Sequence, residues 1–265
     1  RARLAFRSVS ERMPLRDRVV IVTGAARGVG RYVATSFAGE GCRLAIPEID
    51  AERMASTAGD LRDLGAEVLT ATVDVTDERA VSMFMEQVHA HYGRIDVLVN
   101  NAGIVSHRHW GAHWPPVREM EWAFWKSVID TNVGGVFLCT KHALPYMRAA
   151  GAGHVLNIWG GFSRKVVGNP ESIGVAAYSV SKVAVRKFTE FLAEEEREAG
   201  ICIVIVSPGG AMASEDAPDD VKARYPGTDL IGNRFVLAAE AGMELTGEVV
   251  DLDAVGRLVA VNPAW

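Results

Sequence analysis

Tyr178 and Lys182 are the two residues of this chain whose types and spacing point most directly to chemistry. They lie four positions apart in a run that favours a helix, so their side chains share one helix face. A phenol has a pKa near ~10 and is a poor base at neutral pH. A neighbouring ammonium favours the phenolate and can lower that pKa by roughly one to three units. Such a pair can move a proton to or from an alcohol oxygen while hydride passes to or from a cofactor, although the spacing alone is common among surface neighbours.

A glycine-rich turn near the start of the chain predicts a site for a phosphate anion. The β-branched run Val19–Val22 is typical of a strand that is buried on both faces. Gly24, Gly28 and Gly30 follow it, and a helical pattern runs from Arg31 to Glu40. The turn would place free N–H groups at a helix N-terminus, where an anion is stabilised. The spacing G-x-x-x-G-x-G differs from the commoner G-x-G-x-x-G, so an ordinary glycine turn after a strand is the alternative.

Acidic residues after the next two strands indicate how a dinucleotide could be held. Glu48 ends the second predicted strand, where its carboxylate can accept hydrogen bonds from ribose hydroxyls and would repel a 2′-phosphate. This favours NAD over NADP. Arg27 in the turn favours a phosphate instead, and we give Glu48 more weight because its expected place is the ribose itself. Asp74 and Val75 follow the third strand, where Asp74 could hold the adenine amino group or cap a helix. The alternative for Glu48 is a solvated loop acid.

Strand-like and helix-like segments alternate along the chain. The strands are expected at 19–22, 44–46, 68–73, 97–99, 155–158, 201–206 and 248–252. The helices are expected at 31–40, 50–64, 76–91, 119–148 and 176–199, where 119–148 is either one long helix or two abutting helices. The pattern predicts an α/β fold with a doubly wound, mostly parallel sheet of about seven strands and helices on both faces. Ligands of such sheets bind beyond the carboxyl ends of the strands.

The composition excludes several classes of protein. The 265 residues carry a net charge of −5 and 49% are hydrophobic, which suits one α/β domain and offers no basic field for nucleic acid. No apolar run reaches membrane-spanning length. Cys42, Cys139 and Cys202 lie in apolar stretches without paired spacing, so we expect buried free thiols in a reducing compartment and a cytoplasmic protein.

Residues 1–12 are rich in arginine and have no acid before Glu11. They fit either a short transit segment or a read-through upstream of a start at Met13, and we favour the second because the strand pattern begins soon afterwards. We expect this N-terminal extension to be disordered or non-native and residues 13–265 to form a single domain.

Five motifs in order resemble the short-chain dehydrogenase/reductase family. They are Thr23–Gly30, Asn100–Gly103, Asn132 within Asp130–Val133, Tyr178-x-x-x-Lys182, and Pro208-Gly209. The resemblance covers the chain from Met13 to about Asp253. It implies a Rossmann-type fold, a nicotinamide cofactor and a homodimer or homotetramer.

The resemblance also implies roles for individual residues. Tyr178 would be the catalytic acid/base, Lys182 would hold the nicotinamide ribose and lower the pKa of Tyr178, and Asn132 would sit at a helix distortion and hold a water that relays protons. Asn100 would also line the cofactor. The residues expected to bind the cofactor are Gly24, Arg27, Gly28, Val29, Gly30, Glu48, Asp74, Val75, Asn101, Ala102, Gly103, Tyr178, Lys182, Pro208 and Gly209.

The chain departs from the family after the fifth strand. The family usually has a serine there that donates a hydrogen bond to the reacting oxygen, and that position is Gly160 in this chain. Losing one such donor typically costs a hundred- to a thousandfold, or roughly 3–4 kcal/mol. Ser163 is the expected replacement if Gly160 and Gly161 let the loop turn inward. Otherwise a backbone N–H or a substrate group would serve, or the chain would be weak or inactive.

Other segments are expected on the substrate side. Residues 211–230 are typical of a mobile lid, and Ser214 could replace a threonine that touches the nicotinamide in the family. His107, His109 and His113 suggest a loop beside the substrate rather than a metal site, because no cysteine or carboxylate shares their spacing. Trp159 could stack on an apolar ring or simply pack under the lid.

Two functions follow from the sequence. The first is an NAD-dependent oxidoreductase for a secondary alcohol or ketone, which the aromatic surroundings suggest is apolar or cyclic. The second is a cofactor-binding homologue that catalyses little and acts as a sensor or assembly partner, which Gly160 suggests. Intact Asn132, Tyr178 and Lys182 favour the enzyme.

Overall fold

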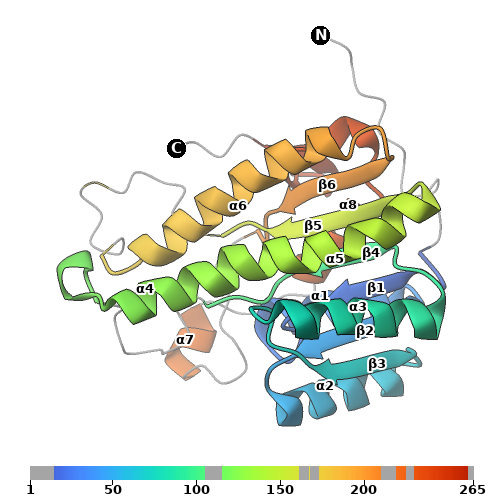
Figure 1. Ribbon diagram of the computed structural model, residues 1–265, viewed down its shortest axis with the longest axis horizontal. Helices are drawn as coiled ribbons and strands as arrows, with labels where there is room; N and C mark the ends of the chain where they lie inside the picture. The colour runs from blue at the N-terminus through green and yellow to red at the C-terminus, as the bar shows by residue number, and fades with distance from the viewer. Residues whose placement is uncertain are drawn as a thin grey trace.

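An eight-stranded sheet forms the centre of the protein in a computed structural model that describes residues 15–104, 115–160, 167, 173–209, 219–224 and 230–261 (Figure 1). The strand order is β3-β2-β1-β4-β5-β6-β7-β8, and only β8 runs antiparallel to its neighbour. The strands are β1 (Val19–Val22), β2 (Arg43–Glu48), β3 (Val68–Thr72), β4 (Val97–Asn100), β5 (Gly153–Ile158), β6 (Ile201–Val206), β7 (Val249–Leu252) and β8 (Leu258–Ala260). The predicted doubly wound, mostly parallel sheet is confirmed, with one strand more than the seven expected.

Helices cover both faces of the sheet. They are α1 (Gly28–Gly39), α2 (Ala51–Asp63), α3 (Glu78–Tyr92), α4 (Trp122–Ile129), α5 (Gly135–Ala150), α6 (Ala176–Glu195), α7 (Asp219–Arg224) and α8 (Leu230–Ala238). One hydrophobic core joins the sheet to α1, α2 and α8, and the other joins it to α3, α5 and α6 (Figure 1). Val20 and Val22 point into the first core and Val19 and Ile21 into the second, which is why β1 is apolar at every position.

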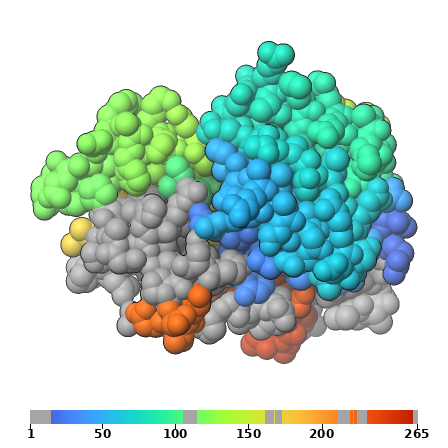
Figure 2. Space-filling view, turned by 90° about the horizontal axis from the view of Figure 1, so that it is seen from below, coloured from blue at the N-terminus to red at the C-terminus, as the bar shows by residue number. Residues whose placement is uncertain are grey.

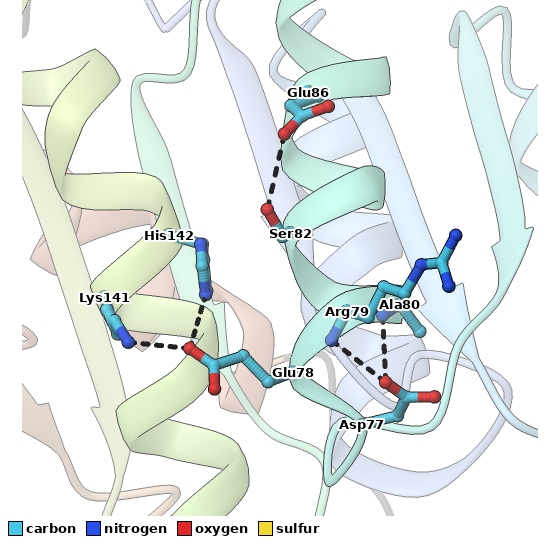
Figure 3. A network of polar contacts seen from close by, with 8 residues as sticks. All are labelled: Asp77, Glu78, Arg79, Ala80, Ser82, Glu86, Lys141 and His142. Carbon is cyan, nitrogen blue, oxygen red and sulfur yellow. Dashed lines mark hydrogen bonds and ion pairs between the residues drawn. The ribbon is translucent and has the colours of Figure 1, made fainter.

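Local sequence signals set most helix boundaries. The Asp50 carboxylate caps α2 by accepting from Arg53 N, and Asp77 caps α3 by accepting from Arg79 N and Ala80 N. Gly93 ends α3 in the left-handed conformation. Beside its cap, α3 is tied to α5 by Glu78, which accepts hydrogen bonds from Lys141 and His142 (Figure 3).

Residues 119–148, for which the sequence predicts one long helix or two abutting helices, contain two helices joined by a π-helical turn. A 3₁₀ turn, Val117–Glu119, precedes α4, and the π-helix Asp130–Gly134 connects α4 to α5. In Figure 2, α4 (green) stands out at one side of the molecule beside the blue and cyan N-terminal half. A π turn of this kind shifts the direction of the side chains around it and is frequent at functional sites.

The parallel register brings the carboxyl ends of β1 to β7 to one edge of the sheet. None of the helices in the described ranges is long and apolar enough to cross a membrane.

Candidate active site

The glycine turn between β1 and α1 has backbone that only glycine adopts easily. Gly24 and Gly28 have φ values of +67° and +56°. At Gly30, a β carbon would lie 2.3 Å from Asn101 Nδ2 and 2.4 Å from the Gly24 oxygen, so a side chain has no room. Helix α1 begins at Gly28, earlier than the expected Arg31, and therefore includes Val29. Its N-cap residue, Arg27, makes no side-chain cap hydrogen bond, and an anion at this N-terminus would be favoured.

Asn101 and Ala102 hold the turn in place from the end of β4. The Asn101 side-chain N–H donates to the carbonyls of Thr23 and Gly24, both at 2.8 Å. The backbone N–H groups of Asn101 and Ala102 donate to Thr23 Oγ1 at 3.0 and 2.9 Å. Two predicted cofactor residues thus brace the turn, and Thr23, which belongs to the motif, is the acceptor that the prediction of site residues omitted.

Glu48 ties the end of β2 to the same turn. Its Oε2 accepts from Ala26 N at 3.2 Å, and its Oε1 accepts from Ile49 N at 2.9 Å. The side chain is half-buried. The carboxylate is therefore held at the carboxyl end of β2, beside the glycine turn, where the sequence predicted it.

Asp74 and Val75 lie after β3 and have structural contacts of their own. Asp74 Oδ1 accepts from both the N–H and the hydroxyl of Thr76, so Asp74 shapes the turn before α3 while Asp77 caps the helix. Val75 is buried, and a β carbon at Gly135 would lie 2.7 Å from its Cγ2. Val75 thus packs on the first turn of α5.

Asn132 lies in the π-helical turn and joins three segments. Its Oδ1 accepts from Ile104 N at 2.7 Å, and its Nδ2 donates to Ile104 O and to Ser181 Oγ, both at 3.0 Å. Ser181 in turn donates to the Tyr178 carbonyl at 2.7 Å. At Gly103, a β carbon would lie 3.1 Å from Asn132 Oδ1. The chain that follows β4 is thereby fixed to helix α6.

Asn100 faces into the protein interior. Its Nδ2 donates to Thr140 Oγ1 and Asn157 Oδ1, and Asn157 Nδ2 donates to Thr189 Oγ1. The Asn100 side chain therefore belongs to a buried chain of polar groups that links β4 and β5 to α5 and α6.

Tyr178 and Lys182 lie together, as their spacing predicts. Lys182 Nζ is 5.6 Å from the centroid of the Tyr178 ring and donates to Ile158 O at 3.1 Å. Burial lowers the pKa of Lys182 to about 8 and raises the pKa of Tyr178 to about 12. The direction for Tyr178 is opposite to the expected one, because burial disfavours the charged phenolate.

Gly160 lies directly against the Tyr178 hydroxyl. A β carbon at Gly160 would be 2.2 Å from that hydroxyl oxygen and 3.6 Å from Lys182 Cε. Trp159, half-buried, donates from its backbone N–H to Val206 O at 2.8 Å.

Several predicted features lie outside the described residues. These are Ser163, Ser214, the three histidines at 107, 109 and 113, and most of the predicted lid at 211–230. Within that lid range, residues 219–224 form α7, and α8 begins at Leu230. The described parts of the chain contain no group of three His, Cys, Asp or Glu side chains that could hold a metal ion.

Tyr178 packs against a small apolar cluster. Val128 and Ala177 are buried, and the partly buried residues packed against them are Ile104, Met120, Phe124, Trp125 and Tyr178. Trp125 thus faces this cluster, while Trp122 is 74% exposed.

The turn after β6 contains Pro208 and Gly209 and has support that the sequence did not reveal. Gly209 has a φ of +82°, and its N–H donates to Ser207 Oγ at 3.2 Å. A β carbon there would lie 2.4 Å from the Arg234 guanidinium carbon, and Arg234 Nε donates to Asp251 Oδ1 at 2.9 Å. This ion pair joins α8 to β7 behind the turn, and no local pattern signals a pair 17 positions apart.

Comparison with curated proteins gives relatives over most of the chain. Cis-4-hydroxycyclohexanecarboxylate dehydrogenase from Sinomonas cyclohexanicum is 35% identical over 253 residues, covering 94% of this chain and 96% of the relative. (2S)-[(R)-hydroxy(phenyl)methyl]succinyl-CoA dehydrogenase subunit BbsD from Thauera aromatica is 36% identical and covers 74% of each chain.

Solved structures agree with the fold. A metagenomic short-chain oxidoreductase in complex with NADP is 28% identical, with a TM-score of 0.71 over 88% of this chain and 94% of that one. NAD⁺-bound xylitol dehydrogenase has a TM-score of 0.75 over 89% of this chain and 97% of that one, and at 23% identity it supports the fold alone. The sequence model of the short chain dehydrogenase family matches residues 18–220. The chain therefore belongs to the short-chain dehydrogenase family and is an oxidoreductase of the hydride-transfer type.

Proposed function

We propose that this protein is an NAD-dependent oxidoreductase that interconverts a secondary alcohol and a ketone, with Tyr178 as acid/base. The observation that carries the proposal is the stacking of Lys182 on Tyr178 beside the end of β5, with Nζ 5.6 Å from the ring centroid. Ser181 and Asn132 connect this pair to Ile104, just after the segment that braces the glycine turn. A proton-transferring group and a dinucleotide cradle thus share one edge of the sheet.

The bound coenzyme would supply the hydride acceptor or donor. In oxidation, the alcohol proton would pass to the Tyr178 phenolate as the carbon loses hydride; in reduction, the phenol would give its proton to the carbonyl oxygen as the carbon gains hydride. With a pKa of about 12 the phenol is protonated at neutral pH, which suits reduction. Oxidation requires the positive charges of Lys182 and of the oxidised ring to stabilise the phenolate.

The coenzyme residues that we propose follow from the contacts of the turn. The N–H groups at the start of α1 would bind the pyrophosphate, as Gly24, Gly28 and Gly30 allow close approach. The Glu48 carboxylate would accept from the adenosine ribose and repel a 2′-phosphate, which favours NAD. Arg27 is the residue that would favour NADP, the coenzyme in the 28% identical solved structure.

The other predicted contacts stand as part of the same proposal. Val29, Asp74, Val75, Asn101, Ala102, Gly103, Pro208 and Gly209 would line the coenzyme, with the Asp74 carboxylate at the adenine amino group. Asn132 would act by positioning α6 through Ser181. The Asn132 side-chain amide already makes hydrogen bonds to Ile104 and Ser181. A proton-relaying water at Asn132 would have to bond to this same amide.

The proposed substrate is an apolar or cyclic alcohol or ketone. The apolar cluster beside Tyr178, which includes Ile104, Met120, Phe124 and Trp125, supports this class. The relative from Sinomonas, named for a hydroxylated cyclohexane ring, agrees with it. We expect a homodimer or homotetramer that works in the cytoplasm, as the sequence suggested.

A second candidate function is a coenzyme-binding sensor with little catalysis. Gly160 favours it, because this position provides no serine hydroxyl for the reacting oxygen. Ser163 remains the proposed substitute donor, and Ser163→Ala tests it directly.

The deciding experiment is a panel of secondary alcohols and ketones, with cis-4-hydroxycyclohexanecarboxylate included, assayed with NAD and NADP by nicotinamide absorbance. Tyr178→Phe should lower kcat on the order of 100- to 10,000-fold with little change in coenzyme Kd. Tyr146→Phe, in α5 against His89, is the matched control and should keep full activity. Tight coenzyme binding without turnover of any compound would favour the sensor.

A further inference from the structure

Gly160 occupies a position where a side chain would meet the end of the Tyr178 side chain. A β carbon there would lie 2.2 Å from the Tyr178 hydroxyl oxygen and 3.3 Å from Tyr178 Cζ. We propose that Gly160 is a positioning residue: its missing side chain gives the Tyr178 hydroxyl the space at the end of β5 that a serine would fill. The inference rests on the proposed function for its kinetic part, and on packing alone for its structural part.

Two neighbouring residues of α6, Lys182 and Ser181, contact Tyr178 and help to hold it in this place. Lys182 Nζ lies over the ring at 5.6 Å from its centroid and is anchored to Ile158 O, two residues before Gly160. The Tyr178 carbonyl accepts from Ser181, which is bonded to Asn132. Helix α6 is thus fixed to β5 and to the π-helical turn, so a side chain at residue 160 would displace the ring rather than the helix.

The displacement would be large on the scale of catalysis. Ordinary van der Waals contact begins at 3.4 Å, so the hydroxyl must move by ~1 Å or more to accommodate a β carbon. A misplacement of about 1 Å can cost on the order of 100-fold in rate, because proton transfer depends on a narrow range of distance and angle. The serine that the family usually has at this position would therefore be harmful in this chain.

The kinetic test compares Gly160→Ala and Gly160→Ser with the wild-type holoenzyme. Both variants should lower kcat on the order of 100-fold, with KM and coenzyme Kd changed by less than about threefold. Gly59→Ala in α2 is the control, since a β carbon there meets no described atom within 4 Å. An increase of kcat in Gly160→Ser would overturn the inference.

A stability cycle tests the packing independently of turnover. Gly160→Ala should lower Tm more in the wild-type background than in Tyr178→Phe, which lacks the clashing oxygen but keeps Cζ at 3.3 Å. Equal losses in the two backgrounds would contradict the proposed contact. If no alcohol or ketone is turned over by the wild type, the proposed function fails while this cycle still decides the role of Gly160.

Discussion

The Glu48 carboxylate accepts a hydrogen bond of 3.2 Å from the backbone N–H of Ala26, across 22 positions of sequence. The end of β2 and the glycine turn are therefore held as one unit. Because Glu48 Oε1 also accepts from Ile49 N, the orientation of the carboxylate is fixed by backbone groups on both sides. A fixed negative charge at this place would disfavour a phosphate that approaches the end of β2, where we propose that the adenosine ribose binds.

Glu48→Ala should relax the preference for NAD. The substitution removes the acceptor for the ribose hydroxyls and the charge that repels a 2′-phosphate, while Arg27 remains. We expect the ratio of kcat/KM for NAD to that for NADP to fall by about tenfold or more, the equivalent of roughly 1.4 kcal/mol. Steady-state kinetics with both coenzymes measures the ratio.

Glu48→Gln separates charge from hydrogen bonding. Its amide oxygen can still accept from Ala26 N, so the turn should stay in place and NADP use should rise through the loss of charge. An unchanged coenzyme ratio in both variants would remove Glu48 as the selector.

Lys182 should make folding stability depend on alkaline pH. Its pKa is 10.5 when exposed and about 8 when folded, so the unfolded chain binds more protons between those values. The free energy of unfolding therefore rises as the pH increases from about 8 to 10.5. Below pH 8, burying the charged Lys182 lowers the free energy of unfolding by its full amount, roughly 3 kcal/mol. The folded pKa of Tyr178, about 12 against 10.0, acts in the opposite sense: its contribution is present below pH 10 and is lost as pH rises to 12.

Lys182→Met should therefore raise the free energy of unfolding at pH 7 by roughly 1–3 kcal/mol. The same variant should abolish turnover. The gain in stability is limited because the hydrogen bond to Ile158 O is lost. Urea unfolding at pH 7 and at pH 10 measures it, with a smaller gain expected at the higher pH. Lys187→Met, at an exposed position of α6, is the control. A less stable Lys182→Met at pH 7 would contradict the assignment.

The sequence predicted the architecture because most of its signals are local. The all-apolar run Val19–Val22 requires burial on both faces, and the caps Asp50, Asp77 and Gly93 mark helix ends through short-range hydrogen bonds and a left-handed backbone. β8 was missed because three residues carry no periodicity of their own.

The site was predictable where residue types share a helix face and not where distant elements meet. Tyr178 and Lys182 followed from spacing, but the direction of the tyrosine pKa depends on how deeply α6 is buried against β5. The Arg234–Asp251 pair and the contact of Gly160 with Tyr178 arise from tertiary packing. Sequence motifs and hydrophobic periodicity carry no information about such contacts between distant elements.

Asn132→Leu should lower both the free energy of unfolding and the affinity for the coenzyme. The variant leaves the Ile104 N–H and carbonyl and the Ser181 hydroxyl without their amide partner. An unsatisfied buried group costs about 1–3 kcal/mol, but Ile104 is only partly buried and the Ser181 hydroxyl keeps its bond to the Tyr178 carbonyl. We therefore expect a loss of roughly 2–4 kcal/mol in urea unfolding and weaker coenzyme binding by calorimetry. Ser181→Ala removes one of the three bonds, together with the bond from Ser181 Oγ to the Tyr178 carbonyl, and should cost about 1–2 kcal/mol. Equal effects of the two variants would contradict a bridging role for Asn132.

Gly209→Ala should destabilise the turn after β6 by strain and by contact together. The residue has a φ of +82°, and its β carbon would meet the Arg234 guanidinium carbon at 2.4 Å. Gly256→Ala has a similar φ of +77° with no described atom within 4 Å of a β carbon, so it measures the strain alone. We expect Gly209→Ala to lose about 1 kcal/mol or more beyond Gly256→Ala in thermal unfolding, and only Gly209→Ala to raise the coenzyme KM.

The Arg234–Asp251 ion pair beside this turn should make the stability of the protein depend on acidic pH. Burial raises the pKa of Asp251, but hydrogen bonds from Arg234, Ser207 and the Leu252 N–H outweigh it and hold the pKa below 3.8. Its stabilisation is therefore present above pH ~4 and is lost as pH falls through the folded pKa. Arg234→Met removes one of those bonds and its charge, so acid unfolding should begin at a higher pH than in the wild type. An unchanged acid midpoint would show that Asp251 keeps its low pKa without Arg234.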